Sequence, residues 1–328
     1  PTSAVTASAD PSCLLSFVKV SSFPLHLTFI SRLSLITTLT MGKEDFLQQI
    51  ENSAEFKLLD KVVKEEVTPQ DAAQEIINMT MTALSVHGPS EQMRVGLADY
   101  NVSLAVMELT QRLEQSKHTK LVEFICYLHK QVAVDPSTNE PLTVQGDTLW
   151  TDMPSFGYTE LETWHEFGGE YKVPCDPTLN SEERERWVKL NAFLAQLTQT
   201  AYIDRTPPKK EVPFNPLDRS LRAIWCMTMA FENDLLVDTA AMESACYWFI
   251  YAAERLWANV VHSCSYPEEC GTGPGKRYKG KDWTGYTQER WGIWEDALKD
   301  ARTKCQDERM RKLMDDALAS LRTGMVNE

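Results

Sequence analysis

The segment 238–262 constrains the fold more than any other part of the chain. It contains the run Ala245-Cys-Tyr-Trp-Phe-Ile-Tyr-Ala-Ala, which is apolar on nearly every side of a helix, and the segment 217–232, with Ala223-Ile-Trp-Cys-Met, is similar. A helix without a polar face must be covered by other elements on several sides. The sequence therefore predicts that these two segments form a central hairpin inside a larger helical protein.

Helical periodicity continues over most of the chain from Glu44 onward, and no alternating run is long enough for a core strand. Thr68-Pro69 is typical of a helix start, His87-Gly88-Pro89 of its end, and Asp135-Pro136 of another end. We therefore expect an all-α fold of about nine to eleven helices. These would be antiparallel helical hairpins that form an irregular multi-helix bundle or a short curved α-α stack.

The first forty residues differ from the rest. They are rich in Ser, Thr and Leu, precede the first methionine, Met41, and contain one acidic and two basic residues. This composition is typical of a transit segment, but we favour upstream sequence that is not native. We expect residues 1–40 to be a disordered leader or non-native upstream sequence and 41–328 to be a single all-helical domain. Prolines and glycines within 137–178 leave a sub-boundary there as an alternative.

Composition limits the partners and the compartment. The 328 residues carry a formal net charge of −14, whereas binding a phosphate backbone needs a surplus of Lys and Arg, so we predict no nucleic-acid partner. The apolar stretch at 23–36 is interrupted by His26 and Arg32, and we predict no membrane association. Eight scattered Cys residues, several of them in apolar helical runs, are typical of reduced thiols and predict a cytoplasmic protein.

Two local motifs resemble ligand sites without meeting their requirements. Gly271-Thr-Gly-Pro-Gly-Lys276 lacks the first glycine and the final Ser or Thr of a phosphate loop, so we interpret it as a mobile surface loop. His262, Cys264 and Cys270 are three potential metal ligands where structural zinc needs four, so we predict no metal and no cofactor. An acidic partner or one phosphate could contact the basic residues that follow, namely Lys276, Arg277, Lys279 and Lys281.

A stripe of polar residues follows the most apolar helix. Glu243, Tyr247, Tyr251 and Arg255 recur every four residues, and Glu232 ends the preceding apolar segment. Charged groups in such surroundings must be paired or must face a cavity. We favour an internal network in which a glutamate binds a tyrosine hydroxyl or one of two arginines, Arg222 or Arg255. The alternative is a helix-lined pocket with apolar walls formed by Trp225, Trp248 and Trp257.

The second half of the chain also resembles a known family. The resemblance is carried by Trp187-Val-Lys-Leu-Asn-Ala-Phe-Leu-Ala-Gln-Leu, Ala230-Phe-Glu232, Ala245-Cys-Tyr-Trp248-Phe-Ile-Tyr-Ala-Ala and Gly285-Tyr-Thr-Gln-Glu-Arg290-Trp291-Gly-Ile-Trp294. These segments are similar to the ascomycete fungal family known as domain of unknown function 3632, over roughly Thr68 to Met325. The resemblance implies a helical intracellular protein and carries no activity. The matching positions are Glu232, Trp248, Arg290 and Trp291.

Two hypotheses for the function follow. The first is a non-catalytic helical protein that binds a protein partner or holds a complex together. The second is a pocket protein or enzyme of fungal secondary metabolism that acts on a small organic molecule, with Glu232 or Glu243 as acid/base, since a carboxylate held dry can have a raised pKa. The candidate ligand-binding residues are Trp225, Glu232, Glu243, Tyr247, Trp248, Tyr251, Arg255, Arg290 and Trp291.

Overall fold

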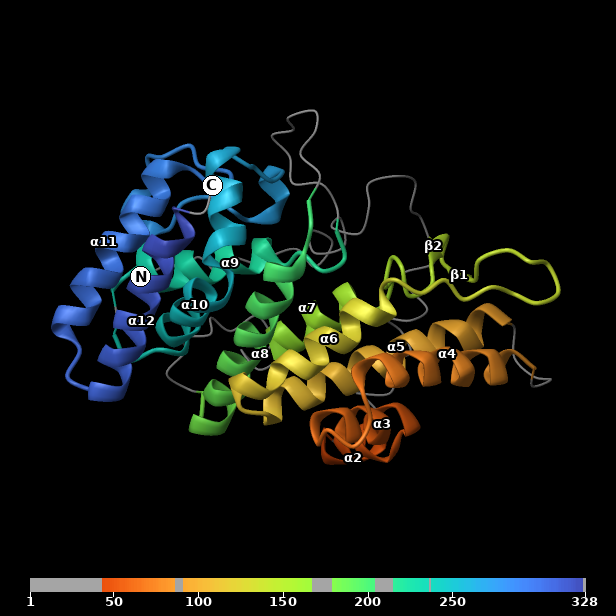
Figure 1. Cartoon of the computed structure of the whole chain (residues 1–328). Helices are drawn as coiled ribbons and strands as arrows, with labels where there is room; N and C mark the ends of the chain where they lie inside the picture. The colour runs from red at the N-terminus through yellow and green to blue at the C-terminus, as the bar shows by residue number, and fades with distance from the viewer. Residues whose placement is uncertain (1–42, 86–90, 167–178, 204–214, 236, 327–328) are drawn as a thin grey trace, which may run out of the picture.

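A computed structural model describes residues 43–85, 91–166, 179–203, 215–235 and 237–326 of the chain. These residues form eleven α-helices and, as their only sheet, a hairpin of β1 (Thr143–Val144) and β2 (Asp147–Thr148), in which Thr143 lies opposite Thr148 (Figure 1). The all-α prediction is confirmed. The prediction for 1–40, the helix end at 87–89 and residues 167–178 of the possible sub-boundary lie outside the described residues.

The bounds of the helices are α2 (Lys43–Asn52), α3 (Ala54–Val63), α4 (Pro69–Ser85), α5 (Glu91–Arg112), α6 (His118–Leu128), α7 (Phe156–Glu166), α8 (Ser181–Thr200), α9 (Ser220–Met227), α10 (Ala240–Val261), α11 (Gln288–Lys304) and α12 (Glu308–Gly324). Helix α4 begins at Pro69 as predicted, but the helix predicted to end at Asp135-Pro136 ends earlier, at Leu128, because the chain there turns into a β-bridge between Val134 and Pro141. Helices α2 to α6 gather at one end of the molecule and α9 to α12 at the other, with α7 and α8 between them (Figure 1). None of the helices in the described part combines the length and apolar character that a membrane crossing needs.

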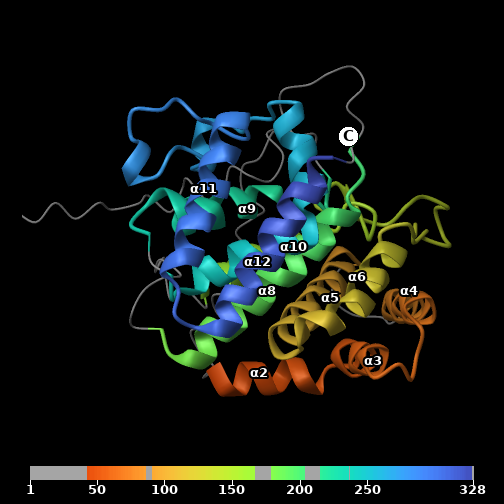
Figure 2. The same ribbon diagram turned by 60° about the vertical axis from the view of Figure 1, so that its left-hand side comes forward.

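Helix α10 lies in the centre of the second half, and its neighbours α8 and α12 run in the same direction as α10. At one end of the α8–α10 pair, Arg184 contacts Asp238, and in the middle the Trp248 indole donates to Asn191 Oδ1 over 3.0 Å. Helix α12 starts beside the start of α10, and Gly324 lies against Ala253 near the other end. Figure 2 shows the three helices side by side. Long connections return the chain between them, so the central pairs are parallel rather than hairpins.

The predicted helix 217–232 consists of two parts. Helix α9 ends at Met227, and a π-helical turn continues over Thr228–Glu232, where Asn233 Nδ2 donates to the Thr228 carbonyl over 3.2 Å. Single π-helical turns are rare and often lie at functional sites. The prediction that this segment is wrapped on all sides holds for the fully buried Phe231 and Glu232 but not for Trp225, which is half-buried.

Asp99 of α5 is buried at the start of α7. Its Oδ2 accepts a hydrogen bond of 2.7 Å from the Ser155 backbone, just before α7 begins. Burial raises the pKa of Asp99 from 3.8 to about 6, and the hydrogen bond from the Ser155 backbone opposes that shift only in part. The folded protein therefore binds a proton at Asp99 more tightly than the unfolded chain does.

His118, at the start of α6, has the opposite property. Its ring is fully buried edge-on against Phe193, and Nε2 lies 2.9 Å from the Thr110 carbonyl oxygen. Burial lowers the pKa of His118 from 6.5 to about 4. The folded protein therefore holds a proton at His118 less tightly than the unfolded chain does.

These two groups predict opposed effects of pH on stability. Between pH 4 and 6 the Asp99 contribution to the free energy of unfolding falls as pH rises, because the folded state holds the extra proton. Over about the same interval the His118 contribution rises with pH, because the unfolded chain holds more protons. Each contribution is at most about 3 kcal/mol, since one pKa unit corresponds to about 1.4 kcal/mol.

Single substitutions should separate the two contributions. We expect Asp99→Asn to become more stable relative to the wild type as pH rises from 4 to 7, and His118→Gln to become more stable relative to it as pH falls over that range. Urea unfolding followed by circular dichroism at several pH values measures both differences. If the variant and wild-type curves stay parallel at all pH values, neither group titrates as described.

Candidate functional site

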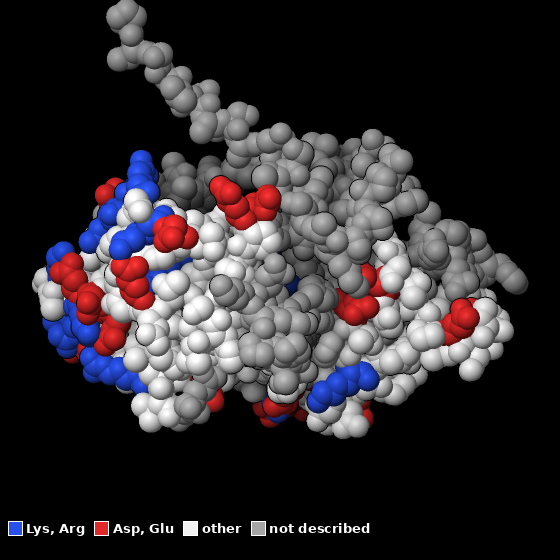
Figure 3. All heavy atoms as spheres, turned by 90° about the horizontal axis from the view of Figure 1, so that it is seen from above, with Lys and Arg blue, Asp and Glu red and all other residues white. Residues whose placement is uncertain are grey.

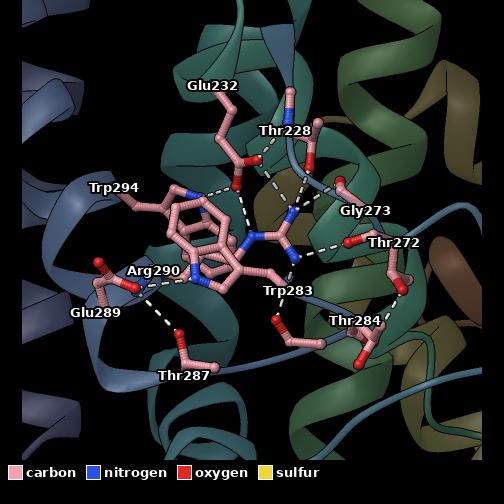
Figure 4. Close-up of polar contacts among 12 residues, drawn as sticks. Thr228, Glu232, Thr272, Gly273, Trp283, Thr284, Thr287, Glu289, Arg290 and Trp294 are labelled. Atoms are coloured by element: carbon pink, nitrogen blue, oxygen red, sulfur yellow. Dashed lines mark hydrogen bonds and ion pairs between the residues drawn. The ribbon is translucent and has the colours of Figure 1, made fainter. Parts of the chain in front are cut away.

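A buried ion pair joins two segments that are far apart in the sequence. Glu232 ends the π-helical turn, and Arg290 lies in the first turn of α11, which Thr287 caps by accepting a hydrogen bond from the Arg290 backbone. Arg290 Nε lies 2.6 Å from Glu232 Oε1, and Nη2 lies 3.1 Å from Oε2 (Figure 4). Both side chains are fully buried. This two-bond geometry is the strongest form of arginine–carboxylate pairing.

The remaining N–H groups of the Arg290 guanidinium also donate hydrogen bonds. Nη1 donates to the carbonyl oxygens of Thr272 and Gly285 over 2.8 and 3.1 Å. Nη2 also donates to Thr228 Oγ1 over 2.9 Å and lies 3.3 Å from the Gly273 carbonyl oxygen. A buried guanidinium is stable when its N–H groups all find acceptors. The acceptors here come from the π-helical turn and from the connection 263–287, so Arg290 binds the two together.

The Glu232 carboxylate oxygens also have a full set of hydrogen-bond donors. Its Oε1 also accepts a hydrogen bond of 2.7 Å from the Trp294 indole, and its Oε2 one of 2.9 Å from the Gly275 backbone. With the two bonds from Arg290, the carboxylate accepts four hydrogen bonds, which is about its full capacity. No acceptor position is left for a substrate proton or hydroxyl group.

Two indole rings flank the guanidinium. The centres of the Trp283 and Trp294 rings each lie 5.4 Å from the Arg290 guanidinium carbon, within cation–π range. Trp283 is held in turn by a hydrogen bond of 3.1 Å from its indole to Glu289 Oε2 (Figure 4). The network is therefore closed on its sides by apolar rings as well as bonded at every polar atom.

The connection 263–287 lies directly on this network, so the prediction of a surface loop is wrong for part of it. Thr272 and Gly275 are buried, and a Cβ on Gly275 would lie 2.6 Å from the Glu232 Cβ and carbonyl oxygen. The Gly275 amide, which would face a phosphate in a phosphate loop, bonds to a carboxylate instead. Within the described residues no group of three or more His, Cys, Asp and Glu is placed to hold a metal ion, and Cys264 and Cys270 are both buried.

The nine candidate residues fall into separate bonded groups. Glu232 pairs with Arg290 rather than with Arg222, Arg255 or a tyrosine hydroxyl, and Trp291 packs beside Trp294 in the same helix. The two other tryptophans donate hydrogen bonds elsewhere, Trp225 to the Cys270 carbonyl oxygen and Trp248 to Asn191. Of the remaining charged residues, Arg255 pairs with Asp218 and Asn259, and Glu243 pairs with Arg309. A ligand-binding role for these residues stays a prediction.

Glu243, Tyr247 and Tyr251 lie partly exposed on α10. The two tyrosine rings are stacked, with centres 5.9 Å apart and planes inclined by 8°. Burial raises the pKa of Tyr247 to about 12 and also raises the pKa of Glu243. The nearby Arg309 opposes both shifts. The Tyr247 hydroxyl therefore stays protonated at neutral pH. These three side chains are not part of the Glu232–Arg290 network.

Several residues of the buried polar clusters were missed by sequence reasoning. Trp294 could have been found, because it follows Arg290 by four residues on one helix face. Thr228 accepts a hydrogen bond from Arg290 because it lies in the π-helical turn, and no sequence pattern predicts such a turn. Trp283 lies in a loop without periodicity. Glu160 in α7 was also missed; it is fully buried and receives two hydrogen bonds of 2.9 and 3.0 Å from Arg222, which lies 62 residues further along the chain.

A comparison with known protein families supports the family resemblance of the segment that contains this network. A family model described as protein of unknown function (DUF3632) matches residues 104–298, which is more than half of the 328 residues. The chain belongs to this family. The DUF3632 match runs from within α5 to within α11 and so includes both partners of the buried ion pair and the whole connection 263–287. It is shorter than the resemblance predicted over 68–325. No curated protein and no solved structure matches the chain.

Proposed function

We propose that this DUF3632 protein is a non-catalytic helical protein that binds a partner protein. The observation that supports this most is the occupancy of Glu232, whose carboxylate is fully buried and already accepts four hydrogen bonds. A general acid or base must reach the proton that it transfers. Using Glu232 in this way would require breaking the network that holds the connection 263–287 in place.

The network presents a basic edge, which we define as residues 276–281. Its cationic residues are exposed, although the chain as a whole carries a net charge of −14. Lys281 pairs with Glu289, and the Arg277 guanidinium lies 5.6 Å from the centre of the Tyr278 ring. Lys276 and Lys279 form no ion pair with any described residue. Figure 3 shows Lys and Arg gathered with acidic residues at the end of the molecule that carries α11 and α12.

The basic edge fits an acidic segment of a partner protein. It is short and lies among acidic residues, so it lacks the extended positive surface that a nucleic-acid backbone requires. Charged groups at the edge of an interface mainly guide association and choice of partner. The proposal includes a cytoplasmic location in a fungus and residues 41–328 acting as one unit, which cell fractionation and limited proteolysis would test.

Charge reversal at the basic edge tests the proposal. We expect native mass spectrometry of the full chain, purified from cells that make it, to show a bound polypeptide. The double variant Lys276→Glu/Lys279→Glu should bind that polypeptide about tenfold more weakly or worse, because two attractive contacts become repulsive. The matched control is Lys57→Glu/Lys61→Glu, which reverses two exposed lysines of α3 and should bind as the wild type does.

Two results would contradict the proposal. One is a retained small molecule with no polypeptide, which would favour the pocket hypothesis. The other is a bound polypeptide whose affinity does not respond to charge reversal at residues 276 and 279, which would place its contact on another surface.

A further inference from the structure

The Arg219 side chain is a nearly buried cation that donates no hydrogen bond to any residue that the structure describes. It precedes α9, and only 12% of its side chain is exposed. Its guanidinium lies 5.3 Å from the centre of the Phe156 ring and rests on Gly157, where a Cβ would lie 3.4 Å from Nη1. Nε is buried without a hydrogen-bond partner, and its distance to the nearest carboxylate oxygen, Glu160 Oε2, is 3.9 Å. That distance is too long for a hydrogen bond.

The carboxylates around Arg219 already have other partners. Glu160 is fully buried and takes both of its short hydrogen bonds from Arg222. Asp218 pairs with Arg255, and both of these side chains are more than nine-tenths buried. The five residues therefore carry three positive and two negative charges, and Arg219 carries the surplus. This count is made over the charged groups that the structure describes next to Arg219.

A guanidinium in this position is incompletely compensated. Burial lowers the pKa of Arg219, but arginine does not lose its proton in proteins, so the charge remains. Contact with an aromatic ring replaces only part of the lost hydration and uses none of the five N–H groups. Buried structural arginines in this protein have acceptors, as Arg290 and Arg222 show. Arg219 differs from both of them in this respect.

We propose that Arg219 binds an oxyanion, the carboxylate or phosphate group of a small ligand, between the start of α9 and the start of α7. The planar guanidinium has two parallel N–H groups that match either group. The exposed remainder of the side chain is where the anion enters. The Phe156 ring and Gly157 hold the guanidinium in place before the ligand binds. The site is separate from the basic edge and from the Glu232–Arg290 network.

Isothermal titration of the full chain with sodium benzoate and with inorganic phosphate, at constant ionic strength and against sodium chloride, tests this site. We expect one saturable site for at least one of the two anions, and the anion that binds identifies the group. Arg219→Gln should weaken binding about tenfold to hundredfold, which corresponds to the loss of charged hydrogen bonds. Arg219→Lys keeps the charge without the two parallel donors and should bind with intermediate affinity.

The control is Arg302→Gln, which changes an exposed arginine of α11 paired with Asp315 and should bind as the wild type does. Without ligand, the melting temperature of Arg219→Gln should equal or exceed that of the wild type, because an incompletely compensated buried charge is removed. Absence of saturable binding of either anion to the wild type at millimolar concentrations would overturn the proposal. So would unchanged binding in Arg219→Gln or, if that variant does not fold, in Arg219→Lys.

Discussion

Arg290→Ala should lower the free energy of unfolding by about 3–5 kcal/mol, the usual cost of removing one partner of a buried ion pair. The substitution leaves the Glu232 carboxylate buried with two of its four donors gone. It also releases the carbonyl groups of Thr272 and Gly285, so the connection 263–287 loses its hold on α11. Urea unfolding followed by tryptophan fluorescence and circular dichroism measures the change.

A matched control lies on the same helix. Arg302 makes two hydrogen bonds to Asp315, of 2.9 and 3.0 Å, but about half of each side chain is exposed. Exposed pairs contribute about 1 kcal/mol or less, so Arg302→Ala should have a small effect. The double variant Glu232→Leu/Arg290→Met should be less destabilised than the sum of its single variants, because no unpaired charge remains. Equal losses for Arg290→Ala and Arg302→Ala would show that the buried pair does not hold the fold together.

Gly275→Ala should destabilise the protein by about 1–3 kcal/mol, as overpacking in a closed site does. The added Cβ would lie 2.6 Å from the Glu232 Cβ and carbonyl oxygen, and the backbone there cannot yield as a flexible side chain would. The loop must then move away from Glu232, and the 2.9 Å hydrogen bond from the Gly275 amide is lost. Unfolding in urea gives the stability change, and proteolysis of the native protein reports release of the loop.

Gly273→Ala is the matched control two residues away. Nothing lies within 4 Å of a Cβ at this position, so the same chemical change should be neutral or slightly stabilising. If Gly275→Ala and Gly273→Ala are equally stable, the loop does not pack on Glu232 as described. Gly275→Ala should also weaken partner binding if the basic edge acts as a preformed surface, since residues 276–281 follow directly.

Local signals were sufficient for most of the helices. Helix α8 has a periodic apolar face, and the side chains of Asn180 and Glu183 cap its start, so its position depends on residues close to it in the sequence. The burial of α10 followed from the absence of a polar face. The cost of burying a charge also predicted that Glu232, in an apolar segment, must either have a partner or face a cavity. These inferences depend on residues within a few turns of each other.

The partner of Glu232 could not be predicted, because Arg290 lies 58 residues further along the chain. Arg222 and Arg255 were nearer in sequence and equally acceptable by charge. The π-helical turn escaped prediction because its residues have ordinary helical propensities, and its Thr228 and Glu232 side chains bind an arginine from another helix.

The amino-acid sequence alone thus determined which segments are helical, which of them is central and that a carboxylate such as Glu232 must be paired or face a cavity, since these depend on periodicity and on the cost of burying charge. Only the tertiary structure decided that α8, α10 and α12 run parallel, that the loop 263–287 covers Glu232 and Arg290, and that the Arg219 side chain has no hydrogen-bond acceptor among the described residues. Each of these depends on the path of long connections, and no local pattern encodes which distant residues such a path brings into contact.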